Sequence, residues 1–273
     1  MHKRIILIIL SVAVFVTGIT AYYLNSLPVS EDLIKECKEE IKQNNFEEVS
    51  LTLSNREVIK AVKAVFMGED TTLMNGDKVL NCETDEFITN IWQDGEYIYY
   101  SFYDWSVSQS VIHRADTEFS RNEFYCILPV NFSGFITVDG IVYGRYVTDS
   151  DEAPHFIVYN LAKYDVEANQ LNIIDHETPG FDVKLFKDGL LYLVGYTENE
   201  IYTFDIENEV MKKLPFRLYD TFRYQYGIEK IEFLNNDIMK VNACREDKKD
   251  DYKEEPVTYL FNTKTGRKLK VEV

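Results

Sequence analysis

The sequence has few of the residues and motifs that usually reveal catalytic chemistry. Its 273 residues include only four histidines, four cysteines and two tryptophans. It contains no nucleophile elbow, phosphate loop, H-E-x-x-H motif or dinucleotide fingerprint. No two cysteines have C-x-x-C spacing, so a structural zinc site is not indicated. The sequence therefore predicts no catalytic residue, no metal site and no cofactor. It leaves open whether the cysteines are free or disulfide-bonded: Cys37, Cys82, Cys126 and Cys244.

Positive charge is also scarce. The chain has 29 Lys and Arg against 46 Asp and Glu, which gives a formal net charge of −17. A strongly acidic surface repels phosphate groups, so nucleic-acid binding is excluded as a function class. Glycine and proline are few, at 12 and 6, whereas Tyr and Phe number 19 and 17. This composition is typical of a packed domain rather than of a disordered chain.

A charge-free run at the N-terminus predicts membrane attachment. Residues 5–24 contain no Asp, Glu, Lys or Arg, and about 20 apolar residues span a bilayer as a helix. Lys3 and Arg4 precede the run, and a basic flank of this kind stays in the cytoplasm. We therefore expect residues 1–28 to form a signal anchor, with a cytoplasmic N-terminus, a single pass through the cell membrane and an extracytoplasmic bulk. A cleaved signal peptide is the alternative.

The next segment, residues 29–84, reads as a helical stalk or a small α/β lid. Ser30 is a suitable N-cap for a helix whose apolar stripe includes Cys37. Ser54–Glu57 has the pattern of a capping box, and apolar residues follow at helical spacing through Val58–Phe66. Asn75-Gly76 then indicates a hairpin turn.

Residues 85–273 repeat one pattern. Each copy has an apolar run, a tight turn, a second run, a third run that ends in Asp or Asn, a polar turn and a fourth run. Successive tight turns lie 45, 49 and 47 residues apart: Asp94-Gly95, Asp139-Gly140, Asp188-Gly189 and Asn235-Asn236. The third runs end at Asp116, Asp165, Asp205 and Asn262. An apolar residue precedes each tight turn at a constant distance: Phe87, Phe132, Phe181 and Ile228.

A four-strand unit at this period is typical of a β-propeller blade. One four-stranded sheet cannot bury both faces alone, so neighbouring sheets must stack around an axis. We predict a mainly β fold, a small β-propeller of about four four-stranded blades, preceded by a transmembrane helix and a short α-helical segment. Unrelated hairpins in a sandwich or meander are the alternative.

The rhythm of these strands and turns resembles that of degenerate β-propellers in extracytoplasmic bacterial proteins. The resemblance covers about Asp85–Val273 and is one of pattern, because the Gly-His and Trp-Asp pairs of WD repeats are absent. It implies a propeller fold and a role in binding, and it transfers no functional residue.

Loops that join second and third strands should lie at the end of the domain opposite the tight turns, and loops on a rigid scaffold commonly carry binding. Exposed Trp, Tyr and Arg are typical anchors of interfaces. The predicted binding residues are Tyr103, Asp104, Trp105, Arg217, Tyr219, Arg223 and Tyr224. Packing of these aromatic residues between blades is the alternative. The mixed charge run Arg245–Glu255 reads as a solvent-exposed loop.

These observations favour a membrane-anchored extracytoplasmic binding protein, whose partner is a protein or a glycan of the cell envelope. They leave the question of an enzyme open. A carbohydrate-active hydrolase that uses loop carboxylates is one alternative, since glycoside hydrolysis needs two facing carboxyl groups. A structural component of the envelope is the other.

Overall fold

The computed structural model describes residues 30–43, 50–53, 57–62, 71–82, 84, 86–149, 157–178, 180–195, 199–250 and 253–271. The chain forms two compact units. Unit 1 combines the N-terminal segment to Asn44 with Leu214–Val273, and unit 2 is Asn45–Lys213. Residues 5–24, for which the sequence predicts a membrane span, lie outside the described residues. Within the described part of the chain, no helix is both long and apolar enough to cross a bilayer.

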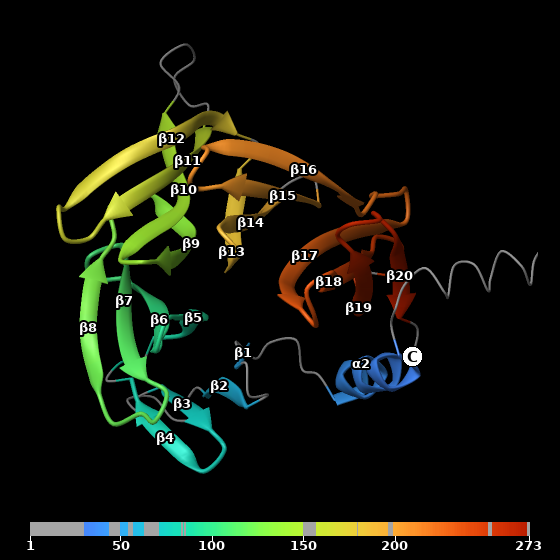
Figure 1. The fold of residues 1–273 in the computed structure, drawn as a ribbon, viewed down its shortest axis with the longest axis horizontal. Helices are drawn as coiled ribbons and strands as arrows, with labels where there is room; N and C mark the ends of the chain where they lie inside the picture. Colours follow the sequence, from blue (N-terminus) through green and yellow to red (C-terminus); the bar gives the residue numbers. More distant parts are fainter. Residues whose placement is uncertain are drawn as a thin grey trace, which may run out of the picture. The chain divides into compact units, whose positions relative to one another are not determined.

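Over the described residues the fold is mainly β and contains five four-stranded antiparallel sheets, each with the architecture of a β-propeller blade (Figure 1). Each sheet is built from four consecutive strands, so its strand order follows the chain. The first sheet contains β1 (Ser50–Thr52), β2 (Val58–Val62), β3 (Thr72–Asn75) and β4 (Lys78–Asn81). The second contains β5 (Ile88–Asp94), β6 (Tyr97–Asp104), β7 (Gln109–Asp116) and β8 (Asn122–Ile127).

The remaining three sheets repeat this meander. The third contains β9 (Phe132–Val138), β10 (Ile141–Asp149), β11 (Ile157–Asp165) and β12 (Gln170–Thr178). The fourth contains β13 (Phe181–Lys187), β14 (Leu190–Gly195), β15 (Glu200–Asp205) and β16 (Val210–Arg217). The fifth contains β17 (Tyr224–Phe233), β18 (Ile238–Asp247), β19 (Lys253–Asn262) and β20 (Lys268–Val271). The helix α2 spans Glu31–Gln43.

The number of blades corrects the prediction of about four. The additional sheet, β1–β4, comes from residues 50–81, which the sequence analysis assigns to a helical stalk or lid. The hairpin predicted at Asn75-Gly76 is confirmed and joins β3 to β4. The repeat pattern does not stand out in this part of the sequence because the four strands are only three to five residues long.

The predicted helix over Val58–Phe66 is wrong where the structure describes it, because Val58–Val62 forms the strand β2. β2 pairs with β1 on one side and with β3 on the other. Ile59 is fully buried, whereas its neighbour Val58 is 40% exposed, as expected for alternation along a strand. Val58, Ile59 and Val62 are β-branched, which favours the extended backbone.

Turn chemistry explains why the predicted strand ends are confirmed. β7, β11, β15 and β19 end at the four Asp and Asn residues that the repeat marks. In each case the side chain accepts a hydrogen bond from a backbone N–H of the following turn, as Asp and Asn favour. The backbone donors, side-chain acceptors and N···O distances are Ser120 to Asp116 (2.8 Å), Ala168 to Asp165 (2.9 Å), Glu207 to Asp205 (3.0 Å) and Thr265 to Asn262 (2.8 Å).

The core of unit 2 is aromatic and joins neighbouring sheets. Trp92 of β5 packs edge-on against Phe135 of β9, with ring centroids 5.8 Å apart, and its Nε1 donates to Thr137 Oγ1 at 2.8 Å. Phe181, on which the repeat alignment rests, is only 2% exposed. Phe87, the corresponding residue of the second sheet, is 64% exposed; there the neighbouring Ile88 is buried instead, so the alignment is wrong by one position.

Unit 1 contains the fifth sheet and α2. The Ser30 cap is confirmed, because Ser30 Oγ accepts a hydrogen bond from Leu33 N at 3.2 Å. Cys37 of α2 packs with Ile238, Leu260 and Val271 of the sheet. Among the described residues none of the four cysteines forms a disulfide bond, which decides the alternative that the sequence leaves open.

Candidate functional site

The predicted binding residues fall into two groups, one in each unit. Arg217, Tyr219, Arg223 and Tyr224 lie in unit 1, at the ends of β16 and β17 and in the loop between them. Tyr103, Asp104 and Trp105 lie in unit 2, at the hairpin between β6 and β7. Each group is described by itself.

The loop of unit 1 presents aromatic side chains to solvent. Phe222 is completely exposed, and Tyr219 is 67% exposed. The loop backbone is nevertheless fixed: Thr221 N donates to Tyr224 O at 2.8 Å, and Tyr224 N donates back to Thr221 Oγ1 at 2.8 Å. Tyr226 N donates to Asp220 Oδ1 at 3.0 Å. A hydrogen-bonded loop thus holds Phe222 in water, although burial of such a ring is normally favourable.

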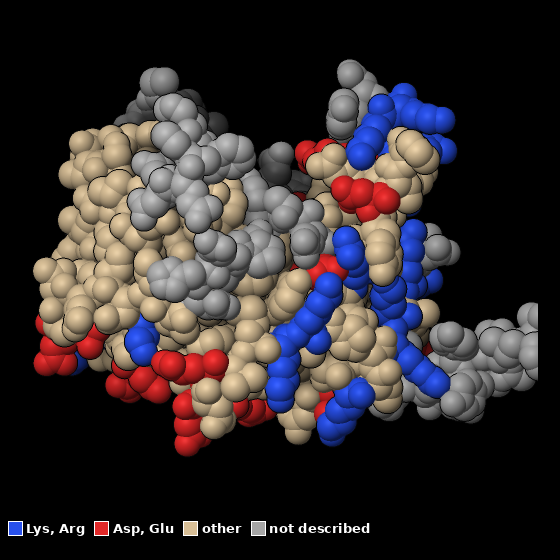
Figure 2. Space-filling model, turned by 90° about the horizontal axis from the view of Figure 1, so that it is seen from above, with Lys and Arg blue, Asp and Glu red and all other residues tan. Residues whose placement is uncertain are grey.

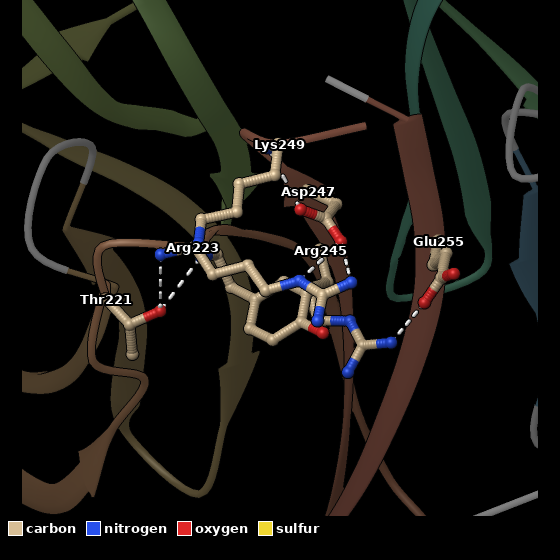
Figure 3. A network of polar contacts seen from close by, with 7 residues as sticks. Thr221, Arg223, Arg245, Asp247, Lys249 and Glu255 are labelled. Carbon is tan, nitrogen blue, oxygen red and sulfur yellow. Dashed lines mark hydrogen bonds and ion pairs between the residues drawn. The ribbon is translucent and has the colours of Figure 1, made fainter. Parts of the chain in front are cut away.

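An ion pair ties this loop to β18 (Figure 3). Arg223 Nε and Nη2 lie 2.8 and 2.7 Å from Asp247 Oδ2. Asp247 Oδ1 accepts a hydrogen bond from Lys249 N at 3.0 Å, and Lys248 N donates to Arg223 O at 2.8 Å. The hydrogen bond from Arg223 holds the pKa of Asp247 below its usual range. The carboxylate therefore stays charged and anchors the loop.

Two guanidinium groups lie close to the Tyr224 ring. Arg223 Cζ is 5.0 Å and Arg245 Cζ is 4.5 Å from the centre of its ring, distances typical of cation–π contacts. Arg245 also pairs with Glu255 across β18 and β19. The hydrogen bond from Arg245 lowers the pKa of Glu255 and raises that of Arg245 itself.

The same arrangement continues along β16 and β20. Arg217 Cζ lies 4.9 Å from the Tyr219 ring, and Lys268 Nζ donates to Arg217 O at 2.7 Å. Burial lowers the pKa of Lys268, which lies 5.3 Å from the Phe216 ring. We name this surface the aromatic–cationic strip, and its members are Arg217, Tyr219, Phe222, Arg223, Tyr224, Arg245 and Lys268.

The strip's partners on β18 and β19 were not predicted from the sequence. The run Arg245–Glu255, predicted as a loop, is instead mostly strand: β18 continues to Asp247 and β19 starts at Lys253. The alternation of Val241, Ala243 and Arg245 on one face of β18 is a signal that could have extended the strand. In Figure 2, Lys and Arg crowd the part of the view occupied by β16–β20, with Asp and Glu between them.

The second predicted group forms an exposed hairpin tip in unit 2. The Trp105 ring packs edge-on against Tyr103, with centroids 4.7 Å apart, and Trp105 remains 72% exposed. Asp104 Oδ1 accepts hydrogen bonds from Ser106 N at 2.8 Å and Ser106 Oγ at 2.6 Å. These bonds, the side-chain one first, lower the pKa of Asp104. Asp104 therefore fixes the turn rather than facing outward as a binding group.

The link between β8 and β9 lies at the same end of this sheet. Gln109 Nε2 donates to Leu128 O at 2.7 Å, and Leu128 N donates to Ser110 O at 2.9 Å. Val107, Ile127 and Val130 are exposed there. We name this surface the neutral platform, and its members are Tyr103, Trp105, Val107, Ile127 and Val130.

A polar cluster lies between the third and fourth sheets. Arg145 of β10 reaches Asp182 of β13, with Nη1 and Oδ1 3.1 Å apart, and donates to Ser133 Oγ at 3.1 and 3.2 Å. Gly134 passes so close that an added Cβ would lie 2.1 Å from Asp182 Oδ1. Lys184 Nζ lies 3.3 Å from Asp182 Oδ2, so both carboxylate oxygens of Asp182 face cations. Because Arg145 belongs to β10 and Asp182 to β13, the cluster joins the third and fourth sheets.

The residues that the structure describes include no group of His, Cys, Asp and Glu that could hold a metal ion. An open depression of about 520 Å³ lies at the hairpin of β3 and β4, lined by Glu57, Val58, Asn75, Gly76, Asp77 and Lys78. None of the predicted binding residues lines it.

Comparisons with known proteins agree with the fold. The chain matches no family model and no curated protein. Among solved structures it is similar to TolB from Acinetobacter baumannii, with a TM-score of 0.50 and 11% identity over 82% of this chain and 51% of that chain. The chain thus spans about half the length of that TolB chain. Others are the β-propeller domain of the Trilobed protease from Pyrococcus furiosus (TM-score 0.40, 13% identity, covering 68% and 57% of the two chains) and an oligogalacturonate lyase in complex with manganese (0.45, 9%, 83% and 76%). At 11% identity the likeness to TolB concerns the β-propeller fold alone.

Proposed function

We propose that this chain is a membrane-tethered binding protein. Residues 5–24 hold it in the cell membrane, the propeller lies on the extracytoplasmic side, and the aromatic–cationic strip docks a protein partner. The similarity of fold to TolB, the lyase and the protease domain does not identify a partner, since proteins of different function share this architecture.

The observation that carries the proposal is the presentation of Phe222. Its side chain is fully exposed on a loop held by backbone hydrogen bonds and by the Arg223–Asp247 ion pair. Interfaces concentrate their binding energy in Tyr, Trp and Arg anchors, and a loop that is already ordered has little entropy left to lose on association. Arg217, at the end of β16, and Tyr219, on the loop, precede Phe222 and supply anchors of this kind.

Site-specific photocrosslinking of the full chain tests the proposal. A photoreactive phenylalanine analogue replaces Phe222 in cells that make the protein, and the same analogue replaces Val79 as the matched control. Val79 is 55% exposed on β4 of unit 2, away from the strip in sequence. We expect one discrete crosslinked species from position 222, which Tyr219→Ala and Arg217→Ala weaken, and none from position 79. Equal adducts at both positions, or none at position 222, would refute docking at the strip.

The tether is tested separately. The full chain should stay in the membrane fraction through alkaline extraction, and protease added outside intact cells should digest the propeller. Replacing Ile9 and Val14 by Asp within residues 5–24 should release the chain, because a charged residue at the centre of a span costs roughly 2.5–3.5 kcal/mol on insertion scales. Release of the unmodified chain by alkali would contradict the tether and leave the strip proposal standing.

No observation on the described residues favours the hydrolase alternative. The carboxylates at the loop ends already have partners: Asp104 accepts from Ser106, Asp182 lies between cations, and Asp247 pairs with arginine. Glycoside hydrolysis needs two carboxyl groups that face each other across a cleft. A structural role in the envelope predicts no discrete crosslink, so the crosslinking experiment separates it from the binding proposal.

A further inference from the structure

We propose that the neutral platform of unit 2 is a second binding site, and that its ligand is an uncharged oligosaccharide that stacks on Trp105. The inference does not depend on the aromatic–cationic strip or on the tether. It rests on three features of the tip: an exposed indole, a fixed backbone and, apart from Asp104, an absence of charged side chains in the segments that form it.

The indole ring is available and is held in place. Trp105 is 72% exposed while Tyr103 supports it edge-on at 4.7 Å. Ser106 is bonded twice to Asp104, and the Gln109–Leu128 bond joins the hairpin to the β8–β9 link. The face of an indole carries partial negative charge, which attracts the weakly polarised C–H bonds on one face of a pyranose ring. A fixed ring of this kind loses little conformational entropy on binding.

Apart from Asp104, the two segments that form the platform are uncharged in a chain that is otherwise rich in charge. Residues 105–113 and 124–138 contain no Asp, Glu, Lys or Arg, although charged residues make up 27% of the sequence. The exposed polar side chains there are Ser106, Ser108 and Asn131, which offer neutral donors and acceptors to sugar hydroxyls. An anionic ligand would find no Lys or Arg in these two segments, and the Asp104 carboxylate at the tip is engaged by Ser106.

The size of the platform also favours a small ligand. Its members come from one hairpin tip and one short link, whereas a standard protein interface uses roughly 20–30 residues on each side. Ligand sites of small molecules combine apolar and aromatic surface with a few polar groups, and the platform has this composition. The aromatic–cationic strip, by contrast, has the Arg and Tyr residues typical of protein docking.

The two tryptophans of the chain provide a direct assay. Trp92 is buried and stacked on Tyr99, so a ligand at the surface should change the emission of Trp105 alone. The full chain, kept in a detergent without sugar headgroups, is titrated with cellohexaose, chitohexaose and maltohexaose, with an oligogalacturonate hexamer as the acidic comparison. We expect a saturable shift of the emission to shorter wavelength with at least one neutral hexasaccharide and none with the acidic one.

Calorimetry on variants tests whether Trp105 makes the contact. Trp105→Ala should weaken binding of the active hexasaccharide at least tenfold, and Trp105→Phe, which keeps a ring, should weaken it less. Phe222→Ala is the matched control, since it removes an exposed aromatic side chain from unit 1, and it should bind as the unmodified chain does. Failure of every neutral sugar up to millimolar concentration, equal binding of the acidic hexamer, or unchanged binding by Trp105→Ala would overturn the proposal. A Trp105-dependent shift with an uncharged apolar peptide, but with none of the sugars, would overturn it in favour of a protein partner.

Discussion

The two units bury their sheets in different ways. In unit 2, neighbouring sheets cover one another, as Trp92 of β5 and Phe135 of β9 show by their edge-on contact. In unit 1, the fifth sheet has α2 against one face, where Cys37 meets Ile238 and Leu260. Its other face packs Phe261 against Phe216, with ring centroids 5.2 Å apart.

The difference shows what a lone sheet requires. A four-stranded sheet has two faces, and a helix can cover one of them as well as another sheet can. The fifth sheet also contains an ion pair with a buried lysine: Lys240 is 6% exposed, and its Nζ lies 2.6 Å from Glu232 Oε1. Burial by itself raises the pKa of Glu232. The positive charges of Lys240 and Lys230 together outweigh burial, so the pKa lies below its ordinary value.

The units also differ in charge. Unit 1 contains 17 Lys and Arg against 16 Asp and Glu, whereas unit 2 contains 12 against 30. The acidity of the protein is therefore a property of unit 2. In unit 1, opposite charges are matched in pairs such as Arg223–Asp247 and Arg245–Glu255. The exposed rings of the strip thus stand among balanced charges, whereas Asp104 is the charged residue in the segments 103–113 and 124–138 that form the platform.

The largest effect should come from the aromatic core of unit 2. Phe181→Ala removes a side chain that is 2% exposed and whose ring lies 4.8 Å from that of Tyr202. We expect a loss of about 3–5 kcal/mol in the free energy of unfolding, measured by urea denaturation of the full chain. Phe87→Ala is the control and should change stability by less than about 0.5 kcal/mol, because Phe87 is on the surface. Equal losses would contradict the assignment of Phe181 to the core.

The contact between α2 and the fifth sheet should matter nearly as much. Leu260→Ala removes a fully buried side chain beneath α2 and should cost about 2–5 kcal/mol. Hydrogen exchange should become faster in α2 and β17–β20 before it changes in β5–β15, because the two units are separately packed. Uniform acceleration along the whole chain would show that the units unfold together, and the distinction drawn above would fail.

A pair of glycines tests close packing inside unit 2. Gly134 and Gly189 both have positive φ, at 57° and 79°, but only Gly134 lies against another side chain, that of Asp182. Gly189→Ala should cost about 1–2 kcal/mol from the left-handed backbone alone. Gly134→Ala should cost more, since the added Cβ displaces Asp182 from Arg145. The difference between the two midpoints of urea unfolding measures this effect, and a difference of zero would contradict the close approach.

The smallest effect should be the pH dependence of the strip. The hydrogen bond from Arg223 lowers the pKa of Asp247 in the folded state. The contribution of Asp247 to the free energy of unfolding is therefore complete above the unfolded pKa of about 3.9. This contribution is lost as the pH falls through the lower pKa of the folded state. Asp247→Asn should therefore be less stable than the unmodified chain at pH 6. The gap should narrow as the pH falls below about 4. Urea titrations of both proteins measure this gap in the free energy of unfolding. A gap that stays constant down to pH 2 would show that the contact between Arg223 and Asp247 stabilises the fold without the negative charge of Asp247.

Much of the strand pattern could be predicted because it depends on neighbours in the chain. The Asp and Asn residues that end third strands accept hydrogen bonds from residues only two to four positions later. The tight turns at Asp139-Gly140 and Asp188-Gly189 have positive φ at both positions, as such turns require. The Ser30 cap belongs to the same class, since it acts within one turn of helix.

The candidate site could be predicted only in part. The sequence indicated the exposed rings of Tyr219 and Trp105, because aromatic residues in loops stand out. It could not indicate that Arg245 and Glu255 pair across two strands, since a mixed charge run has the composition of a loop. The pairing depends on a register between β18 and β19 that extends as far as Asp247 and Lys253.

The sequence by itself determined where most strands begin and end and which residues form the turns, because those features follow from contacts a few residues apart. Only the tertiary structure decided that residues 58–62 form a strand and that β1–β4 form an additional blade. Their apolar spacing fits a helix as well as a strand, and the backbone hydrogen bonds of β1 and β3 on either side select the extended form. Those partners are themselves short, so the sheet exists only because its strands assemble together.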